Sequence, residues 1–359
     1  MKKMLKLVCL SLLALTVAGC GKKVLVPEKT IVAAYVDLEK TYDNGKSVAE
    51  TLLDALPSKE KDAAKSAYEE ALKKIDKFKE KVDVEWAVIS FGGDLKSLAR
   101  HPENNVAVVI KVSTDEAAFK DVVKDIVGGD LDPEKKGDNI VYEMGNARMG
   151  LLDEKYVIFS PSKDAFEDMF DLYDGKGKAS DDFGDLAKIS GDTICRISTA
   201  PISSLLKRFE LTKYIEKFGE ACEDKELVDM ILNMGAISLD VKVGDELGLA
   251  LNVNCDSSSD AKIIESLMRS LAFLGRVGCD AGAFGASNPD LLGSLRASRS
   301  EKSAIVGAKD LFVSLAKKIE ADRSGSVATL SVTLETEQVA DFVKKVAEGE
   351  NSRRSRDDD

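Results

Sequence analysis

After the first 20 residues, cysteine is the residue type whose side chains could carry chemistry, to judge by their number and spacing. Cys195, Cys222, Cys255 and Cys279 all lie in the second half of the sequence. No two of them have CxxC spacing, so a metal site is disfavoured. In an exported protein, four thiols allow three complete pairings. We therefore expect either disulfide bonds or small buried thiols, and no metal site.

The direction in which each strand and helix is expected to run limits which of the cysteines can form a disulfide bond. Cys195 falls near the start of a strand, and Cys222 falls at the end of the helix that returns the chain. Cys255 ends an antiparallel strand at the same edge, whereas Cys279 follows the next helix and reaches the opposite edge. The sequence predicts a bridge from Cys255 to Cys195 or to Cys222. Unbridged thiols buried in strands are the alternative.

The chain contains no recognisable catalytic or nucleotide-binding motif. A P-loop, a three-glycine dinucleotide fingerprint, HExxH and G-x-S-x-G are all absent from the sequence. Asp130 and Asp132 begin a calcium-loop spacing, but Lys135 and Val141 stand where an EF-hand needs Gly and Glu. His101 is the only histidine and is expected in an exposed loop. We expect no enzyme activity and no cofactor. A carboxylate pair hidden among the 63 acidic residues is the alternative.

The first 20 residues carry the three parts of an export signal. Lysines precede an apolar run over 5–17, which is too short to span a bilayer as a helix. The run ends in Val17-Ala18-Gly19-Cys20, which resembles the lipobox of bacterial lipoproteins. That resemblance implies cleavage between Gly19 and Cys20 and acylation of the Cys20 thiol.

The lipobox also implies a location in the cell envelope. Two or more acyl chains on Cys20 hold a protein stably on a membrane, because one chain binds only marginally. In lipoproteins of this type an Asp directly after the cysteine marks retention in the inner membrane, and here that residue is Gly21. We therefore expect the periplasmic face of the outer membrane rather than the inner membrane.

Length and charge limit the domain number and the partners. The chain has 359 residues, which suggests two domains, and a formal net charge of −12. Such a charge argues against nucleic acid as a partner and is typical of a solvated surface. The expected partners are the membrane, reached through the N-terminal acyl chains, and an envelope protein or a surface polymer.

Strands and helices are expected in an order that occurs twice. A strand, helical segments, a strand pair and a helix over 30–127 are matched by the same order over 193–274. This order predicts an α+β fold of two tandem split β-α-β (ferredoxin-like) units, with antiparallel sheets carrying helices on one face. A chance repetition of a common order is the alternative. The helix over 259–274 has one apolar face, formed by Ile263, Ile264, Leu267, Leu271 and Leu274.

Composition sets the expected boundaries. The stretch over 174–182, rich in Gly, Lys and Asp, marks the division between the two domains. The glycine-rich segment over 275–295 is expected to be an irregular, partly buried loop. We expect a signal peptide at 1–19, the lipidated cysteine and a tether at 20–29, repeat domains at 30–178 and 179–348, and a disordered tail at 349–359.

A helix followed by SGSVATLSVTLETEQVADFVKKV resembles the body of uncharacterised envelope proteins that carry paired α+β repeats. The resemblance implies no activity. Three classes of function stay open. The favoured class is a non-catalytic lipoprotein with a binding or structural role, which an exposed apolar patch would support. A periplasmic carrier or sensor of a small or lipid-like ligand would need an apolar cavity between sheet and helices. An enzyme would need an unrecognised carboxylate site.

Overall fold

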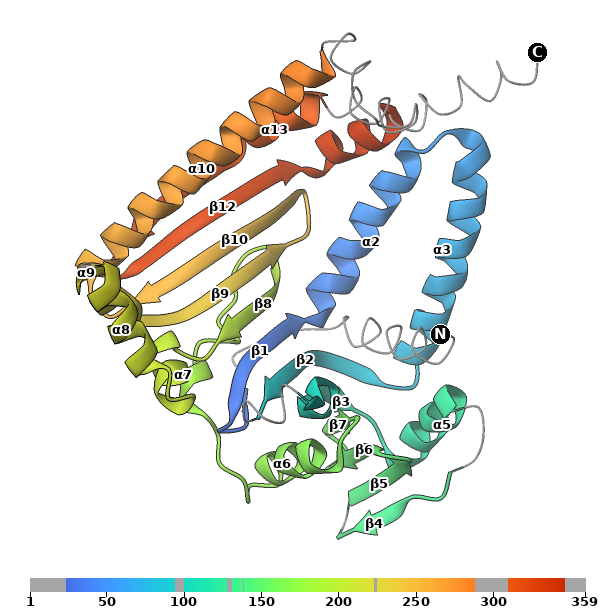
Figure 1. Cartoon of the computed structure of the whole chain (residues 1–359). Coiled ribbons are helices and arrows are strands. Elements are labelled where there is room, and N and C mark those ends of the chain that lie inside the picture. The colour runs from blue at the N-terminus through green and yellow to red at the C-terminus, as the bar shows by residue number, and fades with distance from the viewer. Residues whose placement is uncertain are drawn as a thin grey trace. The chain divides into compact units, whose positions relative to one another are not determined.

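The protein is an α+β protein with a large antiparallel sheet (Figure 1). The computed structural model describes residues 24–93, 100–127, 131–137, 139–222, 225–287 and 309–345. The expected signal peptide and C-terminal tail lie outside these residues. The chain divides into two compact units, the first formed by Met1–Asp43 with Leu72–Leu239 and the second by Asn44–Ala71 with Asp240–Asp359.

In the first unit the strands lie in the order β9-β8-β1-β2-β3-β7-β6-β5-β4. The last three residues of β9 belong to the second unit. The bounds are β1 (Thr30–Asp37), β2 (Asp83–Gly92), β3 (Val106–Ser113), β4 (Glu134–Lys136), β5 (Asn139–Met144), β6 (Ala147–Leu152), β7 (Tyr156–Ser160), β8 (Thr193–Thr199) and β9 (Met234–Lys242). The helices of this unit are α5 (Glu116–Val127), α6 (Lys163–Tyr173), α7 (Ile202–Arg208), α8 (Thr212–Cys222) and α9 (Lys225–Leu232).

Both faces of this sheet are covered, whereas the sequence led us to expect helices on one face. Phe166 and Phe170 of α6 belong to one buried cluster, and Phe119 and Val123 of α5 belong to another. The reason can be seen in β3, which is apolar at almost every position and not at alternate positions. A continuous apolar strand needs cover on both sides.

The connection between β1 and β2 differs from that of a split β-α-β unit. β1 and β2 are direct antiparallel neighbours in the sheet. The chain passes from β1 to β2 through two helices, α2 (Leu38–Ala55) and α3 (Ser58–Lys79). The start of α2 lies beside the end of α3: the Tyr42 hydroxyl donates to the Asp76 carboxylate at 2.5 Å, and the Lys79 ammonium lies 3.8 Å from the centre of the Tyr42 ring. A single helix would lead the chain to the opposite end of the sheet, and the next strand would then run parallel to β1. Two antiparallel helices lead the chain back to the end at which β1 stops, so β2 runs antiparallel to it.

The stretch over 174–182 is not a domain boundary. The Ser180 amide donates to the Val26 carbonyl at 2.7 Å, and β8, which follows this stretch, pairs with β1 in the first unit. The glycines serve a tight turn after α6. Gly175 has a φ of 79°, and a Cβ on Gly177 would lie 2.7 Å from the Leu172 amide nitrogen. The predicted division at 178/179 is therefore wrong.

In the second unit the order is β9-β10-β12-β11, with β10 (Glu246–Cys255), β11 (Ile319–Ser324) and β12 (Val327–Glu335). The helix α10 (Ser258–Ala286) packs along β12 and against α13 (Lys309–Lys318) (Figure 1). α10 continues through Gly275 and Gly282, so the loop predicted to begin at 275 is helical as far as 286. A Cβ on either glycine would lie 3.2 Å from the side chain of Ile319 or Phe312. The glycines therefore allow close packing and do not mark a loop.

The Tyr142 hydroxyl is buried and has no hydrogen-bond partner among the residues that the structure describes, whereas the Tyr142 ring packs edge-on against Phe119. We expect Tyr142→Phe to stabilise the first unit by about 1 kcal/mol, because it removes an uncompensated desolvation cost and keeps the ring. Urea unfolding followed by the fluorescence of Trp86, the only tryptophan, measures the change. The control is Tyr173→Phe, which removes two hydrogen bonds to Leu25 and should destabilise the unit. A lower midpoint for Tyr142→Phe would contradict the expectation.

Candidate functional site

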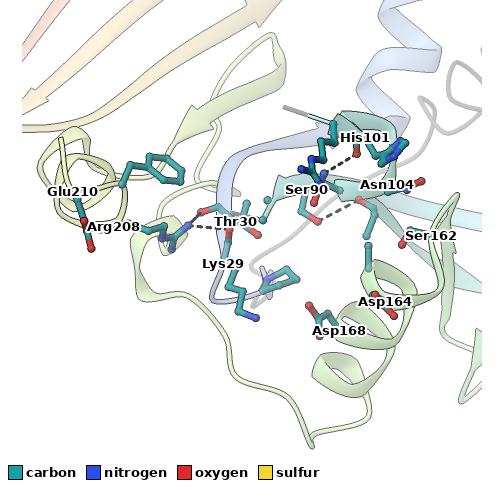
Figure 2. A pocket seen from close by; sticks show the side chains of 18 residues that line it. Lys29, Thr30, Ser90, His101, Asn104, Ser162, Asp164, Asp168, Arg208 and Glu210 are labelled. Atoms are coloured by element: carbon teal, nitrogen blue, oxygen red, sulfur yellow. Dashed lines mark hydrogen bonds between the residues drawn. The ribbon is translucent and has the colours of Figure 1, made fainter. Parts of the chain in front are cut away.

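A pocket of about 890 Å³ opens in the first unit, where several elements end together (Figure 2). Lys29 and Thr30 come from the start of β1, and Ser90 comes from the end of β2. Asp164 and Asp168 extend into it from the first turns of α6. Other walls are the short 3-10 helix η1 (Pro102–Asn105) with His101 before it, and Arg208 at the end of α7 with Phe209 and Glu210 after it.

Several polar groups of the pocket are engaged in holding the backbone. Arg208 donates to the carbonyl oxygens of Glu28, Lys29 and Thr30 at 2.8–3.2 Å. The Ser90 hydroxyl donates to the Ala107 carbonyl at 3.3 Å. These contacts position the start of β1 and fix the rim of the pocket, and neither group is poised as a nucleophile or a general base.

The pocket combines charges of both signs. Lys29, Arg100 and Arg208 are its cations, and Asp164, Asp168 and Glu210 are its anions. His101 is exposed, as predicted, and its carbonyl accepts a hydrogen bond from the Asn105 side chain at 2.9 Å.

The cysteines are not brought together as predicted. Cys195 lies on β8 against a buried cluster of the first unit, whereas Cys255 is buried at the end of β10 in the second unit. Both are thiols, as is Cys279 on α10, so the predicted bridge from Cys255 is not formed. Burial raises the pKa of the Cys255 thiol, and the nearby Asp260 and Asp256 raise it further. Cys222 is the last residue of α8. In the described part of the chain no three His, Cys, Asp or Glu side chains are grouped to hold a metal ion.

Gly19 and Cys20 lie outside the described residues, but most of the predicted tether lies within them. Val26 is buried in the core of the first unit. Pro27 forms an isolated β-bridge with Ala179, and the Glu28 amide donates to the Lys178 carbonyl at 3.2 Å. Residues 24–29 are therefore part of the folded body, which corrects the prediction that all of 20–29 form a tether.

α10 carries an apolar surface that no described element covers. Among the described residues, seven of the eleven large hydrophobic side chains that are exposed lie on this one helix, and their exposed fractions are 42–63 %. They are concentrated and not scattered, which distinguishes them from ordinary surface residues. The members of this α10 apolar face are Ile263, Leu267, Leu271, Phe273, Leu274, Val277 and Phe284.

The sequence places Ile263, Ile264, Leu267, Leu271 and Leu274 on one apolar face of this helix. In the structure Ile264 is buried and the other four are exposed. The buried side consists mostly of small residues and includes Ala261, Met268, Ala272 and Ala283. Small residues at helical spacing were the available signal, because they let α10 pack closely against β12 and α13.

Basic side chains line one border of the α10 apolar face. Lys262, Arg269 and Arg276 follow one another at seven-residue steps and are exposed. Arg269 pairs with Glu265 at 2.6 Å, and Arg276 donates to the Ile319 carbonyl at 3.1 Å. The face spans 21 residue steps, which is about 32 Å of helix, and covers about 160° of its circumference. It is large enough to be an interaction surface.

Comparison with known proteins shows structural likeness only at a distance. No protein-family model matches the chain, and no curated protein matches it. Crystal form I of TP0453 is 11% identical, with a TM-score of 0.38, over 91% of this chain and 100% of that chain. Form III is 9% identical, with a TM-score of 0.41, over 90% and 98% of the two chains. Likeness at this level carries no argument about function. No helix in the described ranges is long and apolar enough to cross a membrane.

Proposed function

We propose that the protein is a non-catalytic lipoprotein of the cell envelope whose α10 apolar face binds the surface of a lipid bilayer. Acyl chains on Cys20 anchor it, at the periplasmic face of the outer membrane. The observation that carries the binding role is the set of seven exposed hydrophobic side chains on one helix. An amphipathic helix with large apolar residues on one face and basic residues beside them is typical of a helix that lies in the membrane interface.

A bilayer is the occupant that the anchor favours. A protein held by acyl chains meets the lipid surface at a high effective concentration, so even moderate apolar affinity is sufficient. Burying the exposed parts of seven hydrophobic side chains supplies the free energy of binding. Lys262 is exposed beside the face and is placed to reach the headgroups with its charged end, whereas Arg269 and Arg276 hold Glu265 and the Ile319 carbonyl.

The two alternative classes of function have less support. A carrier of lipid-like ligands needs an apolar cavity, and the 890 Å³ pocket has charged side chains of both signs in its walls. An enzyme needs convergent catalytic groups, and Ser90 and Arg208 hold backbone carbonyls instead. An envelope protein remains the second candidate partner for the α10 apolar face, because exposed apolar patches also serve protein interfaces.

We also propose that the chain is a tandem repeat of one strand, helices, a strand pair, a helix and a further strand. Supporting this, the strands β1, β2, β3 and β7 lie in that order in the sheet, and β8, β9, β10 and β12 repeat it. The repeated element is related to a ferredoxin-like unit by its order of elements. It differs from that unit by the direct pairing of its first two strands.

Flotation with vesicles tests the proposed bilayer contact. The chain from residue 20 onward, carrying Cys20→Ala and therefore no acyl group, is mixed with phosphatidylcholine vesicles, with and without phosphatidylglycerol. We expect it to float with both, and to do so at about 0.5 M salt, because apolar burial is not screened. Failure to float with either vesicle would overturn the bilayer as occupant and favour an envelope protein in its place.

A further inference from the structure

The N-terminal segment of the described chain is fixed to the first unit from both sides. The Tyr173 hydroxyl accepts from the Leu25 amide at 3.2 Å and donates to the Leu25 carbonyl at 3.1 Å. On the next residue, the Val26 carbonyl accepts from the Ser180 amide at 2.7 Å. Arg208 then holds the three carbonyls of residues 28–30. The chain is therefore anchored to the folded body from Leu25 onward.

This fixes how far the body can lie from an acylated Cys20. Four residue steps separate Cys20 from Val24, and a fully extended chain covers at most about 14 Å in four steps. The tether predicted through residue 29 would reach about twice as far. A body held this closely cannot turn freely, so one part of its surface must stay at the headgroups.

We propose that the bilayer-facing part of the first unit is the surface around Val24, which we call the exit face. It consists of Val24, Leu25, Lys178, Ala179 and Asp181. The bridge between Pro27 and Ala179 is antiparallel, so Asp181 lies opposite Leu25 and close to the point where the chain leaves the body. Lys178, Ala179 and Asp181 are exposed, and Val24 and Leu25 are half-buried. This inference rests on the proposed anchor at Cys20.

The charges of the exit face indicate that tether length, and not electrostatic attraction, brings it to the bilayer. Lys178 is balanced by Asp181, and Asp182 follows directly. The placement should therefore be the same on neutral and on anionic vesicles. At the β4 edge of the first unit's sheet, Lys135 is exposed. It lies three strand spacings, or about 14 Å along the sheet, from β7, whose Tyr156 packs against Tyr173 beside Leu25.

Fluorescence quenching by lipids with nitroxide headgroups tests the placement in the acylated full-length protein. One fluorophore is attached through Asp181→p-acetylphenylalanine, and in a matched variant through Lys135→p-acetylphenylalanine. We expect about threefold stronger quenching at 181 than at 135. Inserting 12 Gly and Ser residues after Gly21 adds about 40 Å of reach and should remove most of this difference.

The outcomes separate this inference from the proposed anchor. Intact mass is measured first on the same samples. If Cys20 is acylated and the label at 181 is quenched no more than the label at 135, the placement is wrong and the anchor stands. The placement is also wrong if the inserted linker leaves the difference unchanged. If the mass shows no acyl chain on Cys20, the anchor itself is wrong and the placement falls with it.

Discussion

The variant Leu267→Glu/Leu271→Glu/Leu274→Glu should lose vesicle binding by about a thousandfold. The three leucines are 50–63 % exposed and lie along the middle of the α10 apolar face. Burying a whole leucine side chain contributes roughly 1.5–3 kcal/mol, so the exposed parts of these three contribute about 4 kcal/mol to the free energy of bilayer binding. The variant loses this contribution, and about 1.4 kcal/mol corresponds to a factor of ten in affinity. Flotation of the chain without acyl groups, titrated with phosphatidylcholine, measures the loss.

A matched control separates the α10 apolar face from apolar area in general. Leu211→Glu/Tyr214→Glu places glutamate at two exposed hydrophobic positions at and before the start of α8, where Tyr214 is 70 % exposed. That variant should bind vesicles as the parent chain does. Circular dichroism shows whether α10 stays helical in the triple variant. Equal loss of binding in both variants would show that the α10 apolar face is not the contact surface.

Phe166→Ala should destabilise the first unit by about 4 kcal/mol. The Phe166 side chain is completely buried on α6, and its ring stacks on Phe170 with centroids 5.5 Å apart. Gly150 of β6 lies so close that a Cβ there would be 3.0 Å from the Phe166 ring. Because this packing is tight, the shortened side chain leaves a cavity that the surroundings cannot fill. Urea unfolding monitored by Trp86 fluorescence measures the change.

The comparison for this prediction is Tyr214→Ala in the same unit. It removes an aromatic ring of similar size from a position that is 70 % exposed, so it should cost less than about 1 kcal/mol. A small effect of Phe166→Ala would mean that α6 is not part of the cooperative core of the first unit. Both variants should bind vesicles normally, because neither residue belongs to the α10 apolar face.

The sequence alone was sufficient for most local structure. The two runs of elements, expected to begin at 30 and at 193, begin in the structure with the strands β1 (Thr30–Asp37) and β8 (Thr193–Thr199). These elements are determined locally, because each has a clear period and is delimited by turn-forming residues. The lipobox at 17–20 is likewise a local signal, and it remains a prediction whose test is the intact mass of the protein.

Only the tertiary structure decided which surfaces are buried and which elements share a sheet. The sequence cannot show which side of α10 is buried. One side carries large apolar residues and the other carries small residues, and either kind of side can pack in a protein core. The glycines at 275 and 282 predicted a loop, yet they allow α10 to approach Phe312 and Ile319, whose positions depend on the rest of the fold. The division at 178/179 failed because β8 pairs with β1, more than 150 residues earlier. Strand pairing and close packing join residues that are distant in sequence, so no local period records them.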